Sequence, residues 1–185
     1  GQKSLCLVEN FKYFPGLEYP DNASLESWND GPGTIARRPF DQTLPADPKQ
    51  TPYFLESEVL SPYAALDPGE EYSFPVYWSP TRAPNPIREA MWAGAISEPL
   101  AGKVEGDRVT LKGVFGVFTP GTIEAAFYSG LGEELAHETL QAVDPREVVR
   151  LEKSVAMPAD AYRVSVLVRD AAGENLGSLG NVILK

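Results

Sequence analysis

A turn between two alternating segments constrains the fold of this chain more than any other feature of the sequence. Pro68 and Gly69 lie at the centre of this turn, in the run Asp67-Pro68-Gly69. Proline presets φ for the second position of a β-turn, and glycine accepts a positive φ at the third. On both sides, over 54–60 and 72–78, polar and apolar side chains follow a period of two. The stretch therefore predicts a strand, a tight turn and a second strand.

The wider composition favours the same class of structure. The chain holds 17 prolines and 16 glycines in 185 residues, which disfavours long helices and suits a fold rich in strands and turns. Its length fits one large domain or two small ones. We predict an all-β chain of two β-sandwich-type units, residues 1–86 and 104–185. Residues 87–103, which follow a proline-rich run, are predicted to be a linker, in which 88–92 form either one helical turn or an extended segment.

The second half shows the more regular strand pattern. Residues 162–169 alternate cleanly, with valine at every second position of one face, and 108–118 and 148–155 follow the same period. Residues 129–136 resemble 170–177, and each run follows an apolar strand. This weak repeat predicts that Glu134 to Leu140 returns as the second strand of a hairpin; a short helix is the alternative, because its residues are good helix formers. The segment resembles an immunoglobulin-like or fibronectin-like β-sandwich, a fold that hosts many functions.

Charge and hydropathy exclude several classes of partner. The net charge of −10 argues against a nucleic-acid backbone or an anionic membrane surface. No apolar run approaches the roughly 18 residues that a membrane span needs. Cys6 is the one cysteine, so no intrachain disulfide can form, which says little about compartment. The compartment stays open, with a leaning towards an exported protein, periplasmic or extracellular, whose leader lies outside this sequence.

Two stretches of the first half carry a family resemblance. One contains Leu60-Ser61-Pro62, the run 66–72 (LDPGEEY) and Trp78, and the other is the run 14–28 (FPGLEYPDNASLESW). Together they resemble the C-terminal portion of a galactose mutarotase-like β-supersandwich, closest to uncharacterised relatives of aldose 1-epimerase. The resemblance covers residues 1–86 and implies a fold that binds or processes carbohydrate.

The resemblance points to one carboxylate in particular. Glu26 matches, by its place between the aromatic-Pro-Asp loop and the Pro-Gly-Glu turn, the glutamate base that takes the anomeric hydroxyl proton in the epimerases. Its strand places Glu26 and Trp28 on one face, where a sugar ring could stack beside a carboxylate. The alternative is an exposed glutamate on a solvated strand face. The candidate site comprises Glu26 as the catalytic residue and, as ligand-binding residues, Tyr19, Asp21, Trp28, Arg37 and Arg38.

The resemblance is incomplete in a way that bears on catalysis. The epimerases pair their glutamate with a histidine acid from an earlier part of the fold, but the one histidine here, His137, lies in the second half. We therefore expect binding without catalysis by this chain, with no cofactor and no metal. Glu56, Glu58, Glu70 and Glu71 could supply oxygen ligands to Ca²⁺, yet no calcium-loop pattern accompanies them and a solvated acidic face is favoured.

Two functional hypotheses follow from these patterns. The first is a carbohydrate-binding or carbohydrate-processing relative, with a groove at Glu26 and Trp28. Residues 29–51, predicted to be a long loop, would form its movable wall. The second is a non-catalytic structural or adhesion-type module of an exported protein, suggested by the sandwich pattern of the second half. The oligomeric state is left open.

Overall fold

The computed structural model describes residues 4–35, 40–47, 49–51 and 53–184. Strands dominate throughout, and the helical content of the described residues is a single 3-10 turn, η1 (Pro20–Asn22). The predicted all-β class is therefore confirmed. The chain divides into two compact units: unit 1 comprises Gly1–Val8 and Trp78–Lys185, and unit 2 comprises Glu9–Tyr77.

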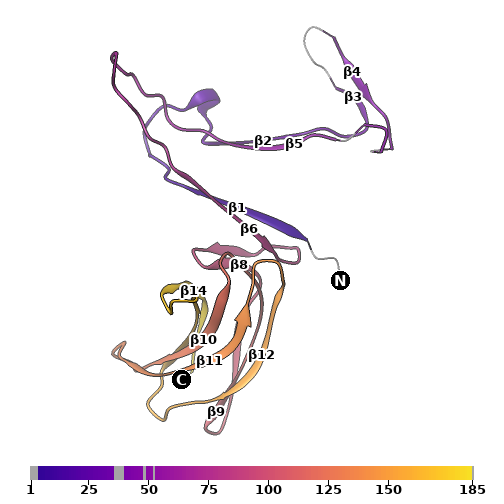
Figure 1. Ribbon diagram of the computed structural model, residues 1–185. Coiled ribbons are helices and arrows are strands. Elements are labelled where there is room, and N and C mark those ends of the chain that lie inside the picture. The colour runs from indigo at the N-terminus through magenta and orange to yellow at the C-terminus, as the bar shows by residue number, and fades with distance from the viewer. Residues whose placement is uncertain (1–3, 36–39, 48, 52, 185) are drawn as a thin grey trace. The chain divides into compact units, whose positions relative to one another are not determined.

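Unit 1 is a sandwich of two antiparallel four-stranded sheets (Figure 1). The first sheet has the order β12 (Val149–Ala156), β9 (Arg108–Val117), β8 (Gly94–Glu105) and β7 (Glu89–Met91). The second has the order β11 (Glu134–Val143), β10 (Gly121–Tyr128), β13 (Arg163–Arg169) and β14 (Asn175–Ile183). The chain crosses between the sheets after β9, β11 and β12, so strands far apart in sequence become neighbours.

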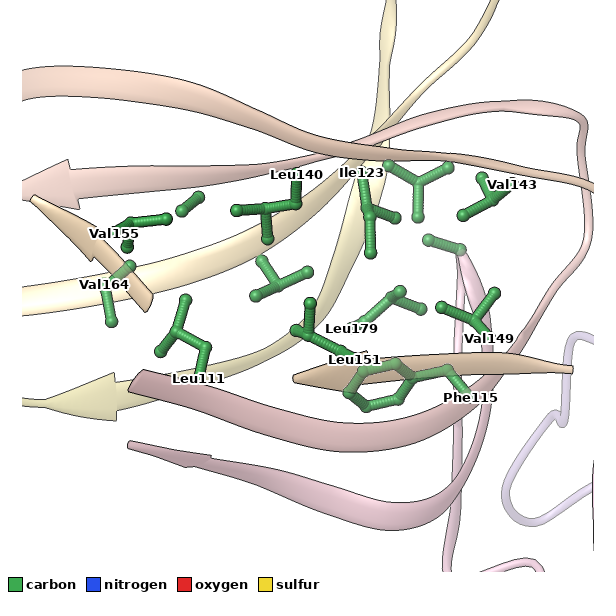
Figure 2. Packing of buried hydrophobic residues seen from close by; sticks show 14 of the residues in the cluster. Leu111, Phe115, Ile123, Leu140, Val143, Val149, Leu151, Val155, Val164 and Leu179 are labelled. Carbon is green, nitrogen blue, oxygen red and sulfur yellow. The ribbon is translucent and has the colours of Figure 1, made fainter. Parts of the chain in front are cut away.

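The core of unit 1 lies between these two sheets. Alternating residues of β9 and β12, among them Leu111 and Leu151, face the residues that β10 and β13 contribute, among them Ile123 and Val164. Figure 2 shows these side chains meeting between the ribbons. The alternation predicted for 108–118 and 148–155 is confirmed, because the inward set of each segment is buried. In 162–169 the three valines are buried as expected, but Tyr162 is exposed and Ser165 and Leu167 of the opposite set are buried too.

One glycine in β9 allows its neighbour to pack. Phe115 is fully buried, and its ring lies over Gly113, where an added Cβ would come within 2.3 Å of the ring. A side chain at this position would require the phenyl ring to move. Close packing therefore accounts for the glycine at this position, because a strand glycine often marks a site of close approach.

The hairpin predicted from the internal repeat is confirmed. β11 runs antiparallel to β10, with Ala126 opposite His137 and Tyr128 opposite Glu134. Serine and glycine form the connecting turn, where the Ser129 hydroxyl accepts hydrogen bonds from the backbone N–H groups of Leu131 and Glu133. A strand, and not the alternative helix, therefore occupies 134–143.

The segment predicted to be a linker, 87–103, is instead part of a sheet. It contains β7 and most of β8, and both belong to the first sheet of unit 1. The pairing of β8 with β9 shifts register between Ile96 and Glu98 and again between Glu98 and Ala101. Each irregularity changes the face on which successive side chains lie, which explains why the sequence shows no clean period of two here.

Unit 2 is built from short paired strands. β2 (Leu25–Asn29) pairs with β5 (Leu55–Val59), and β3 (Gly33–Ile35) pairs with β4 (Gln42–Leu44). β1 (Leu5–Phe11) and β6 (Val76–Arg82) form a third two-stranded sheet. The segment 29–51, predicted to be a loop, therefore holds a small hairpin. Its three-residue strands are too short to display a period.

The turn at Asp67-Pro68-Gly69 forms as predicted. The backbone N–H of Glu70 donates to the carbonyl of Asp67 over 3.0 Å, and Gly69 has φ of +92°. Proline at the second position and positive φ at the third define a type II turn. The strands on its two sides pair with β2 and β1 and not with each other.

Candidate functional site

Strand pairing in unit 2 brings the predicted site residues to one face. β2 and β5 are antiparallel, with Glu26 opposite Glu58 and Trp28 opposite Glu56. Directly opposed residues point to the same side of a sheet, and so do residues two apart in one strand. These four side chains therefore share one face of the ribbon, whereas Leu25 and Leu55 lie on the other.

Trp28 and Glu26 are joined within that face. The indole Nε1–H of Trp28 donates a hydrogen bond of 3.2 Å to the Oε2 atom of Glu26. The tryptophan side chain is 54% exposed, and Glu26 is half-buried. The bond fixes the carboxylate beside the aromatic ring, and the exposed ring is available for stacking.

A shallow hollow of about 350 Å³ lies over these residues. Among the described residues its lining consists of Asp21, Glu26, Ser27 and Trp28. Asp21 reaches it from η1, where Asp21 and Asn22 adopt left-handed backbone angles with φ of 50° and 57°. Aspartate and asparagine tolerate this conformation better than most residues. The turn is closed by the backbone N–H of Ala23, which donates to the carbonyl of Pro20 over 3.0 Å.

Tyr19, predicted to contact ligand, is buried among local contacts. Its side chain is 5% exposed, its ring stacks on Tyr13 with centroids 5.6 Å apart, and its hydroxyl accepts a hydrogen bond from the backbone N–H of Phe14 over 2.9 Å. These contacts hold the loop that precedes η1. The predicted pair Arg37 and Arg38 lies outside the described residues.

The site is acidic and presents mostly hydrogen-bond acceptors. Three carboxylates, Glu26, Glu56 and Glu58, share its face with Trp28, and no lysine or arginine among the described residues is ion-paired with them. Among the described residues, no group of acidic, histidine or cysteine side chains is arranged to hold a metal ion. The chemistry available is stacking on the indole and acceptance of hydrogen bonds from hydroxyl or ammonium groups.

The histidine considered as an acid partner belongs to the other unit. His137 lies in β11 of unit 1, exposed, with its Nδ1 atom 3.1 Å from the Oε1 atom of Glu134. Its contact is thus a local pair on a strand surface.

Sequence reasoning missed the neighbours that β5 supplies. Glu56 and Glu58 were weighed only as a calcium site or a solvated face, yet they lie directly across from Trp28 and Glu26. Their alternation in 55–59 placed them on one face, but the pairing of β5 with β2 could not be seen because a long segment separates the two strands. Ser27 also lines the hollow, but no sequence pattern marked it as a ligand-binding residue.

Comparisons with known proteins add no relative to this picture. A scan against protein families, a search of curated proteins and a search of solved structures each found no match. In the described part of the chain, no helix combines the length and the apolar character that crossing a membrane requires.

Proposed function

We propose that unit 2 binds carbohydrate in the hollow formed by Asp21, Glu26, Ser27 and Trp28. The observation that carries the proposal is the hydrogen bond between Trp28 and Glu26, which sets a carboxylate beside an exposed indole at the edge of this hollow. A sugar ring combines apolar C–H faces with hydroxyl donors, so it can stack on the ring while its hydroxyls donate to the carboxylate oxygens.

The size of the hollow suits a small ligand. Its volume of about 350 Å³ falls at the lower end of the range of roughly 300–1,000 Å³ that ligand pockets span. The shallow, exposed form favours weak binding, because polar groups exchange water contacts for protein contacts at little net gain. Stacking on Trp28 is then the main source of affinity, worth about 1 kcal/mol.

The proposed role of Glu26 is that of a hydrogen-bond acceptor. Opening a sugar ring requires two proton-transfer groups, a base and an acid. Unit 2 contains no histidine in its sequence, and Glu26 is already engaged with the indole of Trp28. Binding without turnover is therefore the activity assigned to this chain.

Two likenesses of fold support this proposal. We assign residues 1–86 to the galactose mutarotase-like group on the motifs quoted above. We assign unit 1 to the immunoglobulin-like or fibronectin-like sandwiches on its strand order, in which a three-stranded meander (β7 to β9), two hairpins (β10-β11 and β13-β14) and one returning strand (β12) divide between two sheets. Carbohydrate binding is an expectation of the first likeness, and the second implies no particular ligand.

The second candidate function is a structural or adhesion-type module without a small ligand. The observation that favours it is the complete core of unit 1, whose two sheets bury a continuous set of apolar side chains. This reading predicts that no saccharide perturbs unit 2.

An NMR titration of the full chain with a panel of mono- and oligosaccharides tests the proposal. The Trp28 indole resonance and the amides of β2 and η1 should shift together on addition of a binding sugar. Trp28→Ala should weaken binding by about fivefold or more, since the stacking contribution is lost. Trp92→Ala is the matched control, because Trp92 is also exposed, at 71%, but lies in unit 1.

The outcomes separate the two candidate functions. Joint shifts that Trp28→Ala removes and Trp92→Ala retains support carbohydrate binding at the hollow. No shift with any sugar in the panel would remove this function and leave the structural module. Shifts confined to unit 1 would place binding elsewhere and contradict the assignment.

A further inference from the structure

The ribbon of β2 and β5 stands without a third strand in the described part of the chain. Each strand therefore has one edge whose backbone groups face no other strand, and such an edge is a template for pairing with another chain. A ribbon of two strands alone is only marginally stable in water. On the face opposite Glu26 and Trp28, Leu55 is 80% exposed and Leu25 is 52% exposed, and between them the Ser57 hydroxyl donates a hydrogen bond of 2.9 Å to the Oε2 atom of Glu9.

The opposite face of the ribbon carries unbalanced charge. Glu26 lies directly across from Glu58, and Glu56 follows on the same face. Like charges placed directly opposite each other destabilise a strand pair, and opposite charges stabilise it. In the described residues no basic side chain is ion-paired with these carboxylates. Cations delivered to this face would relieve the repulsion.

The pattern of β5 disfavours a second copy of this chain as the partner. The strand reads Leu-Glu-Ser-Glu-Val from Leu55 to Val59. Antiparallel self-pairing centred on Ser57 would place Glu56 of each copy opposite Glu58 of the other. The ladder would then add two like-charge pairs to the one already present between β2 and β5.

We infer that the free edge of β5 accepts an extended segment of another protein, in which lysine or arginine alternates with apolar residues. The basic side chains would lie beside Glu56 and Glu58, and the apolar ones would cover Leu55 and Val59. Strand addition of this kind takes affinity from backbone hydrogen bonds and specificity from alternate side chains. The β5 edge is chosen because the saccharide hollow is lined from β2 and η1.

The charge of unit 2 as a whole favours such a partner. Residues 9–77 contain twelve acidic and four basic residues, so this unit holds most of the net charge of the chain. A surface of one sign attracts ligands of the opposite sign and raises their rate of association, with a strong dependence on ionic strength.

The test uses the full, isotope-labelled chain and a synthetic peptide of about nine residues in which lysine alternates with valine, long enough to form a strand. Addition of the peptide should shift the amides of β5 and slow their exchange with solvent, and binding should weaken as salt is added. The double variant Glu56→Gln with Glu58→Gln should bind about fivefold less tightly, because two cross-strand charge pairs are lost. Glu71→Gln is the matched control on the same unit and should bind as the unaltered chain does.

Three results would overturn the inference. The first is equal binding of a peptide with the same composition but with lysines and valines in separate blocks, which would indicate charge attraction without strand pairing. The second is protection of β5 amides in the absence of peptide together with a dimer in sedimentation, which would identify a second copy as the occupant. The third is absence of binding at low salt.

Discussion

Unit 1 and unit 2 are both assembled from antiparallel strands, but they bury their side chains very differently. In unit 1 the two four-stranded sheets enclose a continuous core that includes Leu111, Phe115 and Phe127. In the described part of unit 2, the buried residues are Tyr19, Leu44 and Pro62. Many of its large apolar side chains, such as Leu55 and Trp28, are exposed.

This contrast indicates which unit has side chains free of core packing and able to contact a ligand. A strand that faces a second sheet commits every other residue to packing, as β9 and β13 do. A two-stranded ribbon commits fewer side chains to packing, and the side chains of β2 and β5 are all exposed or half-buried. The proposed saccharide hollow and the proposed strand-binding edge are accordingly both located on unit 2.

The largest expected effect compares one apolar truncation in each unit. Phe115→Ala should lower the free energy of unfolding by about 3–5 kcal/mol, because the ring is fully buried and its loss leaves a cavity. Leu55→Ala, at a side chain 80% exposed, should change it by less than about 0.5 kcal/mol. Urea unfolding followed by circular dichroism measures both, and equal losses would contradict the contrast.

Removal of a polar contact inside unit 1 should cause the next largest loss of unfolding free energy. The guanidinium of Arg169 in β13 is paired through its Nε atom with the Oε2 atom of Glu124 in β10, and their side chains are 24% and 11% exposed. This bond raises the pKa of Arg169 above its ordinary value. Glu124→Gln should cost about 1–2 kcal/mol in unfolding free energy, because a half-buried cation loses its partner while retaining partial access to water.

A double-mutant cycle separates the pair from other effects of the substitution. Arg169→Gln and the double variant complete the cycle, and a coupling energy near zero would show that the pair does not stabilise the sandwich.

A smaller effect is expected from the one tyrosine that unit 2 buries. Tyr19→Phe should cost about 1 kcal/mol, because the backbone N–H of Phe14 loses the hydroxyl acceptor. Amide exchange of Phe14 should become faster, and the saccharide affinity should be unchanged because Tyr19 does not line the hollow in the described structure. A loss of saccharide binding in Tyr19→Phe, with no change in the exchange of the Phe14 amide, would contradict this account and make Tyr19 a ligand residue.

The smallest effect concerns an exposed ion pair on unit 1. The Arg146 guanidinium donates two hydrogen bonds to the carboxylate of Asp144, over 2.9 and 2.7 Å, and these bonds, with a backbone bond from Arg146, lower the pKa of Asp144 to about 2. A pKa depressed by folding stabilises the protein above the unfolded value of 3.8 and ceases to do so as pH falls towards 2.

The stability curve of Asp144→Asn should accordingly meet that of the unaltered chain near pH 2. At neutral pH the variant should be only slightly less stable, since exposed pairs contribute little. A difference that grows as the pH falls below 4 would contradict the sign of this effect.

Much of unit 1 could be predicted because its strands obey a simple period. The valines at 164, 166 and 168 alternate with other side chains, and all three are buried in the core. The hairpin of β10 and β11 followed from a repeated turn. β8 escaped prediction because two register shifts interrupt its alternation. The interruption also made the segment before 104 resemble a linker.

The candidate site could be predicted only in part, for a different reason. Parity along a single strand placed Glu26 and Trp28 on one face, and the structure adds their hydrogen bond. Alternation within one strand cannot show which distant strand pairs with it. The positions of Glu56 and Glu58 opposite Trp28 and Glu26 therefore required the structure. Tyr19 belongs to the run that carries the family resemblance, and the sequence could not show that its ring is buried against Tyr13.

Hydrogen exchange of the full chain, with and without the tightest-binding saccharide of the panel, tests the central claim most directly. Amides in β9, β10 and β13 should exchange only with global unfolding, and those of unit 2 should exchange much faster by local opening. Saccharide should slow exchange in η1 and β2 and leave the sandwich strands unchanged. Protection that appears in the sandwich strands, or unit 2 amides already as slow as those of unit 1, would contradict the division into a packed unit and a ligand-binding unit.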